Sequence, residues 1–123
     1  MNKTRFSRTV ALALLCPMFL GCLCRGPDEV HVKEAQLKNT LHLMRGAIDQ
    51  YTQDHNRAPQ ELNDLVKAHY FLEIPKDPIT GSADTWQLVE EEVLTLNQNS
   101  PGITDIHSGS HQISSEGTAY STW

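Results

Sequence analysis

Hydrophobic residues divide the chain into two parts that differ in their pattern. In the first part, residues 10–20 form an apolar run of eleven residues, which Pro17 interrupts. The run follows three basic residues, Lys3, Arg5 and Arg8. A positive stretch before a short apolar run is typical of a targeting segment, whereas a membrane-spanning helix needs about 20 apolar residues. We therefore predict a signal or anchor segment over residues 1–21 and a tether over residues 22–29.

The second part opens with apolar residues that recur at alternating spacings of four and three. These residues are Leu37, Leu41, Met44, Ile48 and Tyr51. Such spacing places them on one stripe of an α-helix, with charged and amide residues on the other faces. We predict a helix over residues 30–54 that leaves the helical conformation through a left-handed residue at His55 or Asn56.

A second, shorter helix is predicted from Pro59 to the region of Tyr70. Proline suits the first position of a helix, and three apolar residues follow at helical spacing. They are Leu62, Leu65 and Val66. The next segment, residues 74–81, holds two prolines, an aspartate and a glycine, and is therefore predicted to be a structured loop.

Short strands are predicted in the last third of the chain. Residues 85–89 and 93–96 form a hairpin in this prediction, with the glutamates of residues 90–92 in its turn, and residues 103–107 add a third strand. The last segment, residues 108–123, is rich in Ser, Gly and Thr but carries Tyr120 and Trp123, so we expect it to dock onto the body. The predicted fold class is α+β, with one globular domain over residues 30–123.

Composition and charge narrow the function classes. The chain of 123 residues has a net charge of -5 and no basic face, which argues against nucleic-acid binding. All three cysteines lie near the N-terminus, at positions 16, 22 and 24, so the predicted domain has no disulfide and no thiolate metal site. The domain also lacks a Gly-x-Ser-x-Gly motif and a phosphate-binding glycine loop, and we expect no enzyme activity.

The stretch Phe19-Leu20-Gly21-Cys22 resembles a bacterial lipobox, in which the cysteine becomes the lipid-modified first residue of the mature protein. Lipidation at Cys22 is the favoured interpretation. An uncleaved short anchor and an ordinary secretory signal are the alternatives, and residue types alone leave all three open.

Four strings carry a resemblance to a known family. They are KEAQLKNTLHLMRGAIDQYTQDHNRAPQELNDLV, the stretch GAIDQYTQDHNRAP inside it, YFLEIPKDPITGSADTW and DIHSGSHQISSEGTAYSTW. In this order they resemble the globular part of type II secretion pseudopilins, and most closely the major, G-type pseudopilin. The resemblance covers residues 30–123. The prepilin motif at the N-terminus is missing, because no glycine precedes Phe6 and Val10 stands where the family has a glutamate.

The resemblance implies a pilin-like fold, in which a long N-terminal amphipathic helix and a short helix pack on a small antiparallel sheet. It also implies a structural subunit of a type II secretion or type IV pilus-like apparatus, with other pseudopilin or secretion-apparatus subunits as partners. The protein would be anchored in the bacterial cell envelope with its globular domain in the periplasm. The stripe from Leu37 to Tyr51 would then be partly core and partly subunit contact. The alternative is a free-standing envelope lipoprotein whose pilin-like head is a binding module.

Metal binding is the last candidate chemistry. G-type pseudopilins hold calcium in their C-terminal loop, and the matching loop here offers Asp105, Ser108 and Glu116. Because calcium prefers several carboxylate and carbonyl oxygens, we expect no bound metal and keep these three residues as a weak calcium alternative. His107 and His111 have a spacing compatible with zinc, but they lack further ligands.

Overall fold

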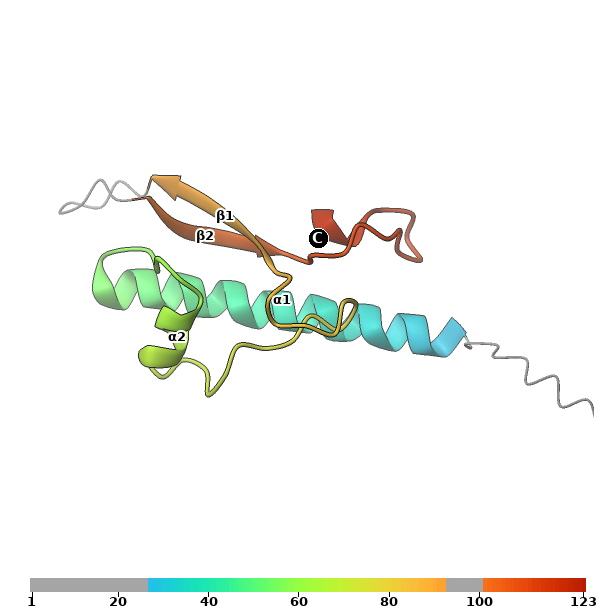
Figure 1. Cartoon of the computed structure of the whole chain (residues 1–123), viewed down its shortest axis with the longest axis horizontal. Coiled ribbons are helices and arrows are strands. Elements are labelled where there is room, and N and C mark those ends of the chain that lie inside the picture. The colour runs from blue at the N-terminus through green and yellow to red at the C-terminus, as the bar shows by residue number, and fades with distance from the viewer. Residues whose placement is uncertain (1–26, 93–100) are drawn as a thin grey trace, which may run out of the picture.

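The computed structural model describes residues 27–92 and 101–123. The elements are helix α1 (Pro27–His55), helix α2 (Asn63–Lys67), strands β1 (Gln87–Glu92) and β2 (Pro101–His107), and the 3₁₀ turn η1 (Tyr120–Thr122). The two strands and the C-terminal segment run along one side of α1, and α2 lies on the other side (Figure 1). The fold is therefore α+β, with the long helix as its central element.

Helix α1 forms where the periodic stripe predicts it. Its five apolar residues are buried, with exposed fractions between 0% for Leu37 and 4% for Tyr51. The helix ends at His55, and the next residue, Asn56, has a φ of 53°, a left-handed conformation that asparagine tolerates better than most residues. The predicted position and ending of this helix are confirmed, and its start lies three residues earlier than predicted.

The second helix is shorter than the sequence pattern indicates. It begins at Asn63 rather than at Pro59, because the backbone before it is committed to other partners. The carbonyl of Pro59 accepts a 2.8 Å hydrogen bond from the Ile103 amide of β2. The Asp64 carboxylate accepts the amides of Gln60 and Glu61 at 3.0 and 3.1 Å, so these donors are satisfied outside a helix.

The strand prediction is corrected in one respect. The glutamates of residues 90–92 lie inside β1 and not in a turn, and β1 pairs directly with β2 in antiparallel register. The exposed side chains of Glu90 and Glu91 are compatible with a strand here because β1 lies at the edge of a two-stranded sheet, where water solvates them. The predicted strand over residues 103–107 is confirmed within β2, and the predicted strand over residues 93–96 lies outside the described residues.

An irregularity in the register allows β2 to bury two isoleucines that are three residues apart. Ile103 and Ile106 would point to opposite faces of a regular strand. The pairing passes from Val89 with Asp105 to Glu90 with Ile103, so Thr104 is the extra residue on β2. This bulge turns both isoleucines toward the core, where each is 0% exposed.

The core is formed by the α1 stripe together with residues from α2, β2, η1 and the segment before β1. Leu65 of α2, Trp86 before β1, the two β2 isoleucines and Tyr120 of η1 complete it. Tyr120 is 4% exposed, so the predicted docking of the C-terminal segment onto the body is confirmed. Among the helices of the described residues, none combines the length and the apolar character that a membrane crossing requires.

Candidate functional site

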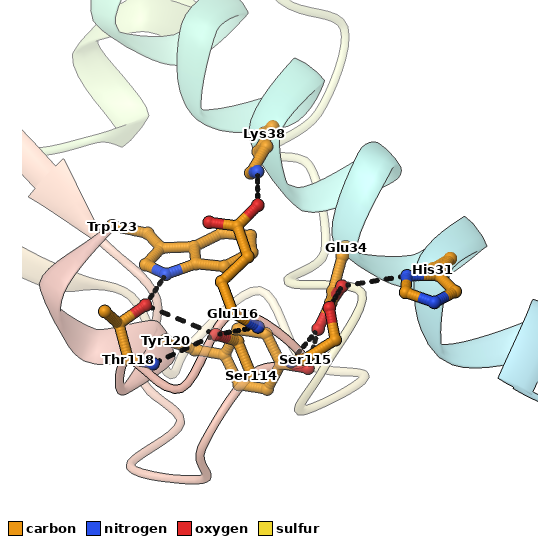
Figure 2. A network of polar contacts seen from close by, with 9 residues as sticks. All are labelled: His31, Glu34, Lys38, Ser114, Ser115, Glu116, Thr118, Tyr120 and Trp123. Carbon is orange, nitrogen blue, oxygen red and sulfur yellow. Dashed lines mark hydrogen bonds and ion pairs between the residues drawn. The ribbon is translucent and has the colours of Figure 1, made fainter.

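The most elaborate polar arrangement in the described residues joins α1 to the C-terminal segment (Figure 2). Three side chains of α1 carry it, namely Glu34, Lys38 and Arg45. They reach residues 105–107 and 114–123, which follow them by 60 residues or more. We call this arrangement the helix–tail junction.

Glu34 is the buried part of the helix–tail junction, with 5% of its surface exposed. Its carboxylate accepts the amide of Ser115 at 2.7 Å, the Ser115 hydroxyl at 2.5 Å and the Tyr120 hydroxyl at 2.8 Å. His31 lies 3.5 Å away, one turn earlier on the helix. A buried carboxylate with three donors is satisfied, so Glu34 can lie in the core and bind the tail there.

The same contacts shift the acid–base behaviour of both partners. Hydrogen bonds from the side chain and then the backbone of Ser115, with smaller contributions from Tyr120 and His31, lower the pKa of Glu34 to about 2 against the opposing effect of burial. Burial, and then the hydrogen bond to Glu34, raise the pKa of Tyr120 to about 12. At neutral pH the pair is therefore an ionised carboxylate that accepts a hydrogen bond from a neutral phenol.

Lys38 forms the exposed part of the helix–tail junction. Its ammonium group lies 2.5 Å from a Glu116 carboxylate oxygen and 4.5 Å from the centre of the Trp123 ring. The Trp123 indole donates in turn to the Thr118 hydroxyl at 2.8 Å. Because Lys38 and Glu116 are both more than half exposed, this ion pair adds little stability by itself and chiefly orients the aromatic ring.

Arg45 ties the helix, the sheet and the tail together through one guanidinium group. Its Nε atom donates to Asp105 at 2.6 Å. Its Nη2 atom donates to the carbonyls of Ile106 at 2.8 Å and Trp123 at 2.9 Å. The guanidinium group of arginine is planar and has several N–H donors, so it can bond to three acceptors at once. A lysine ammonium group cannot reproduce this geometry.

A second buried carboxylate, Asp77, holds the segment that links β2 to the tail. It is 0% exposed and accepts the Ser108 hydroxyl at 2.6 Å and the Gly109 amide at 3.1 Å. It also accepts the Ile79 amide within its own loop at 2.8 Å. The predicted structured loop over residues 74–81 is thus anchored to the end of β2.

The residues named from the sequence occupy different places in this arrangement. The five stripe residues from Leu37 to Tyr51 are all buried against this chain's own sheet, tail and second helix. In this structure they are core, and none of them offers an exposed surface for a subunit contact. Cys22, the lipidation candidate, lies outside the described residues.

The weak calcium alternative is not supported by the contacts of its three residues. Asp105 pairs with Arg45, Glu116 pairs with Lys38, and Ser108 donates to Asp77. Asp105 and Glu116 thus each pair with a basic side chain, and the Ser108 hydroxyl is hydrogen-bonded to a carboxylate outside the candidate set. Within residues 27–92 and 101–123, no group of three His, Cys, Asp or Glu side chains is placed to hold a metal ion.

The two histidines with zinc-like spacing also have separate partners. His107 contacts the Trp123 carbonyl at 2.5 Å and lies 3.7 Å from Asp105, whereas His111 contacts the Ser121 hydroxyl at 3.3 Å. Each ring therefore serves the packing of the tail.

Sequence reasoning missed Glu34, Arg45 and Asp77. For Glu34 the signal was present, because the spacing of the stripe continues backward from Leu37 to Glu34 and puts this carboxylate on the apolar face. Arg45 follows Met44 at the edge of the stripe, and Asp77 lies in a loop. The sequence around these two residues therefore does not indicate which groups their side chains contact. Among the described residues, every buried side-chain polar atom has a partner, which makes the helix–tail junction a fully satisfied packing arrangement.

Comparison with known proteins adds no relative. No family model, no curated protein and no solved structure matches this chain.

Proposed function

We propose that this chain is a pseudopilin-like structural subunit of a type II secretion or type IV pilus-like apparatus, acting in protein secretion through protein–protein contacts. The observation that supports the proposal most is the arrangement around α1. A helix of 29 residues carries the short helix, the sheet and the docked tail, in the chain order that the resemblance implies. The contacts of the helix–tail junction hold the body together, which is compatible with a structural role.

The position of α1 fits an anchored protein. The helix begins at Pro27, five positions after Cys22, so a lipid on this cysteine or an uncleaved residue 10–20 segment would hold the body close to a membrane surface. With the anchoring that the resemblance implies, the globular domain would lie in the periplasm, with other subunits of the apparatus as its partners.

One observation favours the second candidate function, a free-standing envelope lipoprotein with a pilin-like binding head. The apolar run of residues 10–20 is short and contains Pro17, and the prepilin glycine and glutamate are missing. A lipid at Cys22 would provide an anchor without the long apolar helix that builds a filament.

Photo-crosslinking in the native host separates the two functions. A photoreactive amino acid replaces Leu43, which is 53% exposed on α1, or Ile113, which is 65% exposed in the tail. The first function predicts crosslinks to other apparatus subunits, and these crosslinks disappear in cells that lack the apparatus. Crosslinks that persist unchanged in such cells would instead support the lipoprotein.

Mass spectrometry of the mature N-terminus, on protein from the same membrane fraction, gives the second readout. A chain that begins at Cys22 with added acyl mass identifies a lipoprotein. A chain that retains residues 10–20 extends the pseudopilin proposal to the N-terminal segment.

A further inference from the structure

An open groove lies beside β1. Its volume is about 480 Å³, and it lies between the residues that precede α2 and the start of β1. Its apolar lining consists of Leu62, Ile74, Ala83, Trp86 and Leu88. Its polar lining consists of Gln60, Glu61, Asn63 and Asp84. Clefts of this size and mixed character are typical of binding sites.

The floor of the groove is rigid and its rim is accessible. Trp86 is 7% exposed, and its indole nitrogen donates to the Pro75 carbonyl at 2.8 Å, which fixes the ring. Leu88 is 40% exposed although it is a large apolar residue in a strand. An apolar side chain of a partner could therefore cover Leu88 without any rearrangement of the floor.

The groove adjoins β1 through Leu88, and in the described residues the two edges of the sheet differ. The outer edge of β2 is occupied, since its Ile103 amide donates to the Pro59 carbonyl at 2.8 Å. Gln60 also donates to the Pro101 carbonyl there, at 2.8 Å. In the described residues, no backbone hydrogen bond outside the β1–β2 pair involves Leu88 or Glu90 of β1.

The pairing pattern shows which β1 groups face the free edge. Leu88 lies opposite Ile106, whose carbonyl accepts from Arg45, and Glu90 lies opposite Ile103, whose amide is taken by Pro59. Opposed residues in an antiparallel pair either bond to each other or both face outward. Leu88 and Glu90 therefore direct their amide and carbonyl groups away from β2, toward an added strand.

The charge around this edge selects the partner. Glu61 and Asp84 line the groove, no Lys or Arg among the described residues lines it, and Glu90 and Glu91 are exposed on β1. Lys67 lies 3.8 Å from Glu61 but outside the groove lining. Two copies of this chain would oppose their glutamates if they paired through β1, and like charges in directly opposite positions are unfavourable. A basic partner is favoured instead.

We propose that the β1 edge and its groove bind an extended peptide segment of another protein, in which two basic residues adjoin two apolar residues. The segment adds a third strand to the sheet. Its apolar pair faces Leu88 and Val89, with one side chain in the groove, and its basic pair faces Glu90 and Glu91. The inference rests on the geometry of this edge and is independent of the proposed role in secretion.

Acidic residues on an edge strand have a simpler role as well. Charges on such a strand discourage pairing with other chains. The two roles make opposite predictions for a basic strand. The protective role predicts that it does not pair with β1, like any other strand, whereas the binding role predicts that it does.

The test uses the full chain in a zwitterionic detergent and the fluorescein-labelled peptide Thr-Lys-Lys-Val-Leu-Thr, with fluorescence anisotropy as the readout. We expect saturable binding, and about tenfold weaker binding by the double variant Glu90→Gln and Glu91→Gln, because two charge pairs are lost. The matched control removes two exposed carboxylates elsewhere, with Asp49→Asn and Glu73→Gln, and keeps the affinity of the wild type.

Two further peptides separate strand addition from charge attraction alone. The peptide Thr-Glu-Glu-Val-Leu-Thr should not bind. A version of the basic peptide with N-methyl groups on alternate amides keeps its charges but loses donors on one edge, and we expect at least tenfold weaker binding. Absence of binding by the basic peptide would overturn the proposal, as would equal binding by the N-methylated peptide or equal weakening in the matched control.

Discussion

The Tyr120 hydroxyl donates a 2.8 Å hydrogen bond to the Glu34 carboxylate, across 86 positions of sequence. Ser115 adds two more donors to the same carboxylate. Glu34 is therefore buried in line with the α1 stripe, and it also anchors the tail through its hydrogen bonds. This double role makes the stability of the fold depend on the ionisation of one glutamate.

Glu34→Gln tests that dependence through pH. The folded-state pKa of Glu34 is about 2, below its ordinary value of 4.5, so its contribution to stability is present above pH 4.5 and is lost as the pH falls toward 2. We expect the variant to melt below the wild type at pH 7 and the two melting temperatures to converge between pH 4.5 and 2.

Circular dichroism melts from pH 2 to 7 provide the measurement. The carboxylates of Asp54, Asp64 and Asp105 also have lowered pKa values, so the wild type loses stability in acid for several reasons. The difference between the two proteins isolates Glu34, because the other groups are common to both. A difference that stays constant down to pH 2 would contradict the assignment.

Arg45→Lys is expected to loosen the tail while α1 stays folded. The lysine can replace one of the contacts to Asp105, Ile106 and Trp123 but not all three. We expect a loss of about 1 kcal/mol, the usual net value of a hydrogen bond. Amide hydrogen exchange should be faster than in the wild type at Thr122 and Trp123, whose amides donate to the carbonyls of Ala119 and Tyr120.

The matched control is Arg57→Lys, since Arg57 is exposed beyond the end of α1. It should leave exchange in the tail unchanged. If exchange in α1 accelerates as much as exchange in the tail, Arg45 supports the whole fold and not the tail in particular.

Neighbouring residues on α1 should differ sharply in their tolerance of alanine. Met44 is 0% exposed and Leu43 is 53% exposed. Met44→Ala leaves a cavity against the sheet and the tail, and we expect a loss of about 2–5 kcal/mol. Leu43→Ala should change the free energy of unfolding by no more than about 0.5 kcal/mol. Denaturant titration measures both, and similar losses would show that the helix is packed differently.

Two glycines give predictions of opposite sign. A Cβ atom at Gly109 would overlap the carbonyl oxygen of Thr85, whereas one at Gly46 meets nothing within 4 Å. Gly109→Ala should therefore cost about 1–3 kcal/mol through backbone crowding. Gly46→Ala should stabilise α1 by up to about 1 kcal/mol, because alanine is the better helix former. Thermal melts of both variants test the signs, and stabilisation by Gly109→Ala would contradict the close contact with Thr85.

Local patterns in the sequence predicted the elements that depend on local physics. The alternating spacing from Leu37 to Tyr51 predicted α1, and the tolerance of asparagine for left-handed conformations agrees with its ending at Asn56. The strand predicted over residues 103–107, after a turn segment, likewise lies within β2. Helix periodicity and capping are properties of neighbouring residues, so one chain suffices to predict them.

Partnerships between distant residues were decided by the tertiary structure. The sequence indicates that residues 90–92 are solvated, but only the pairing with β2 makes them strand rather than turn. The late start of α2 depends in part on a hydrogen bond between distant residues, from the Ile103 amide to the Pro59 carbonyl. The helix–tail junction depends on contacts such as Arg45 with Trp123, and no local rule states which distant carbonyl a side chain will meet. Packing selects these partners because a buried polar group must find a donor or an acceptor wherever the fold provides one.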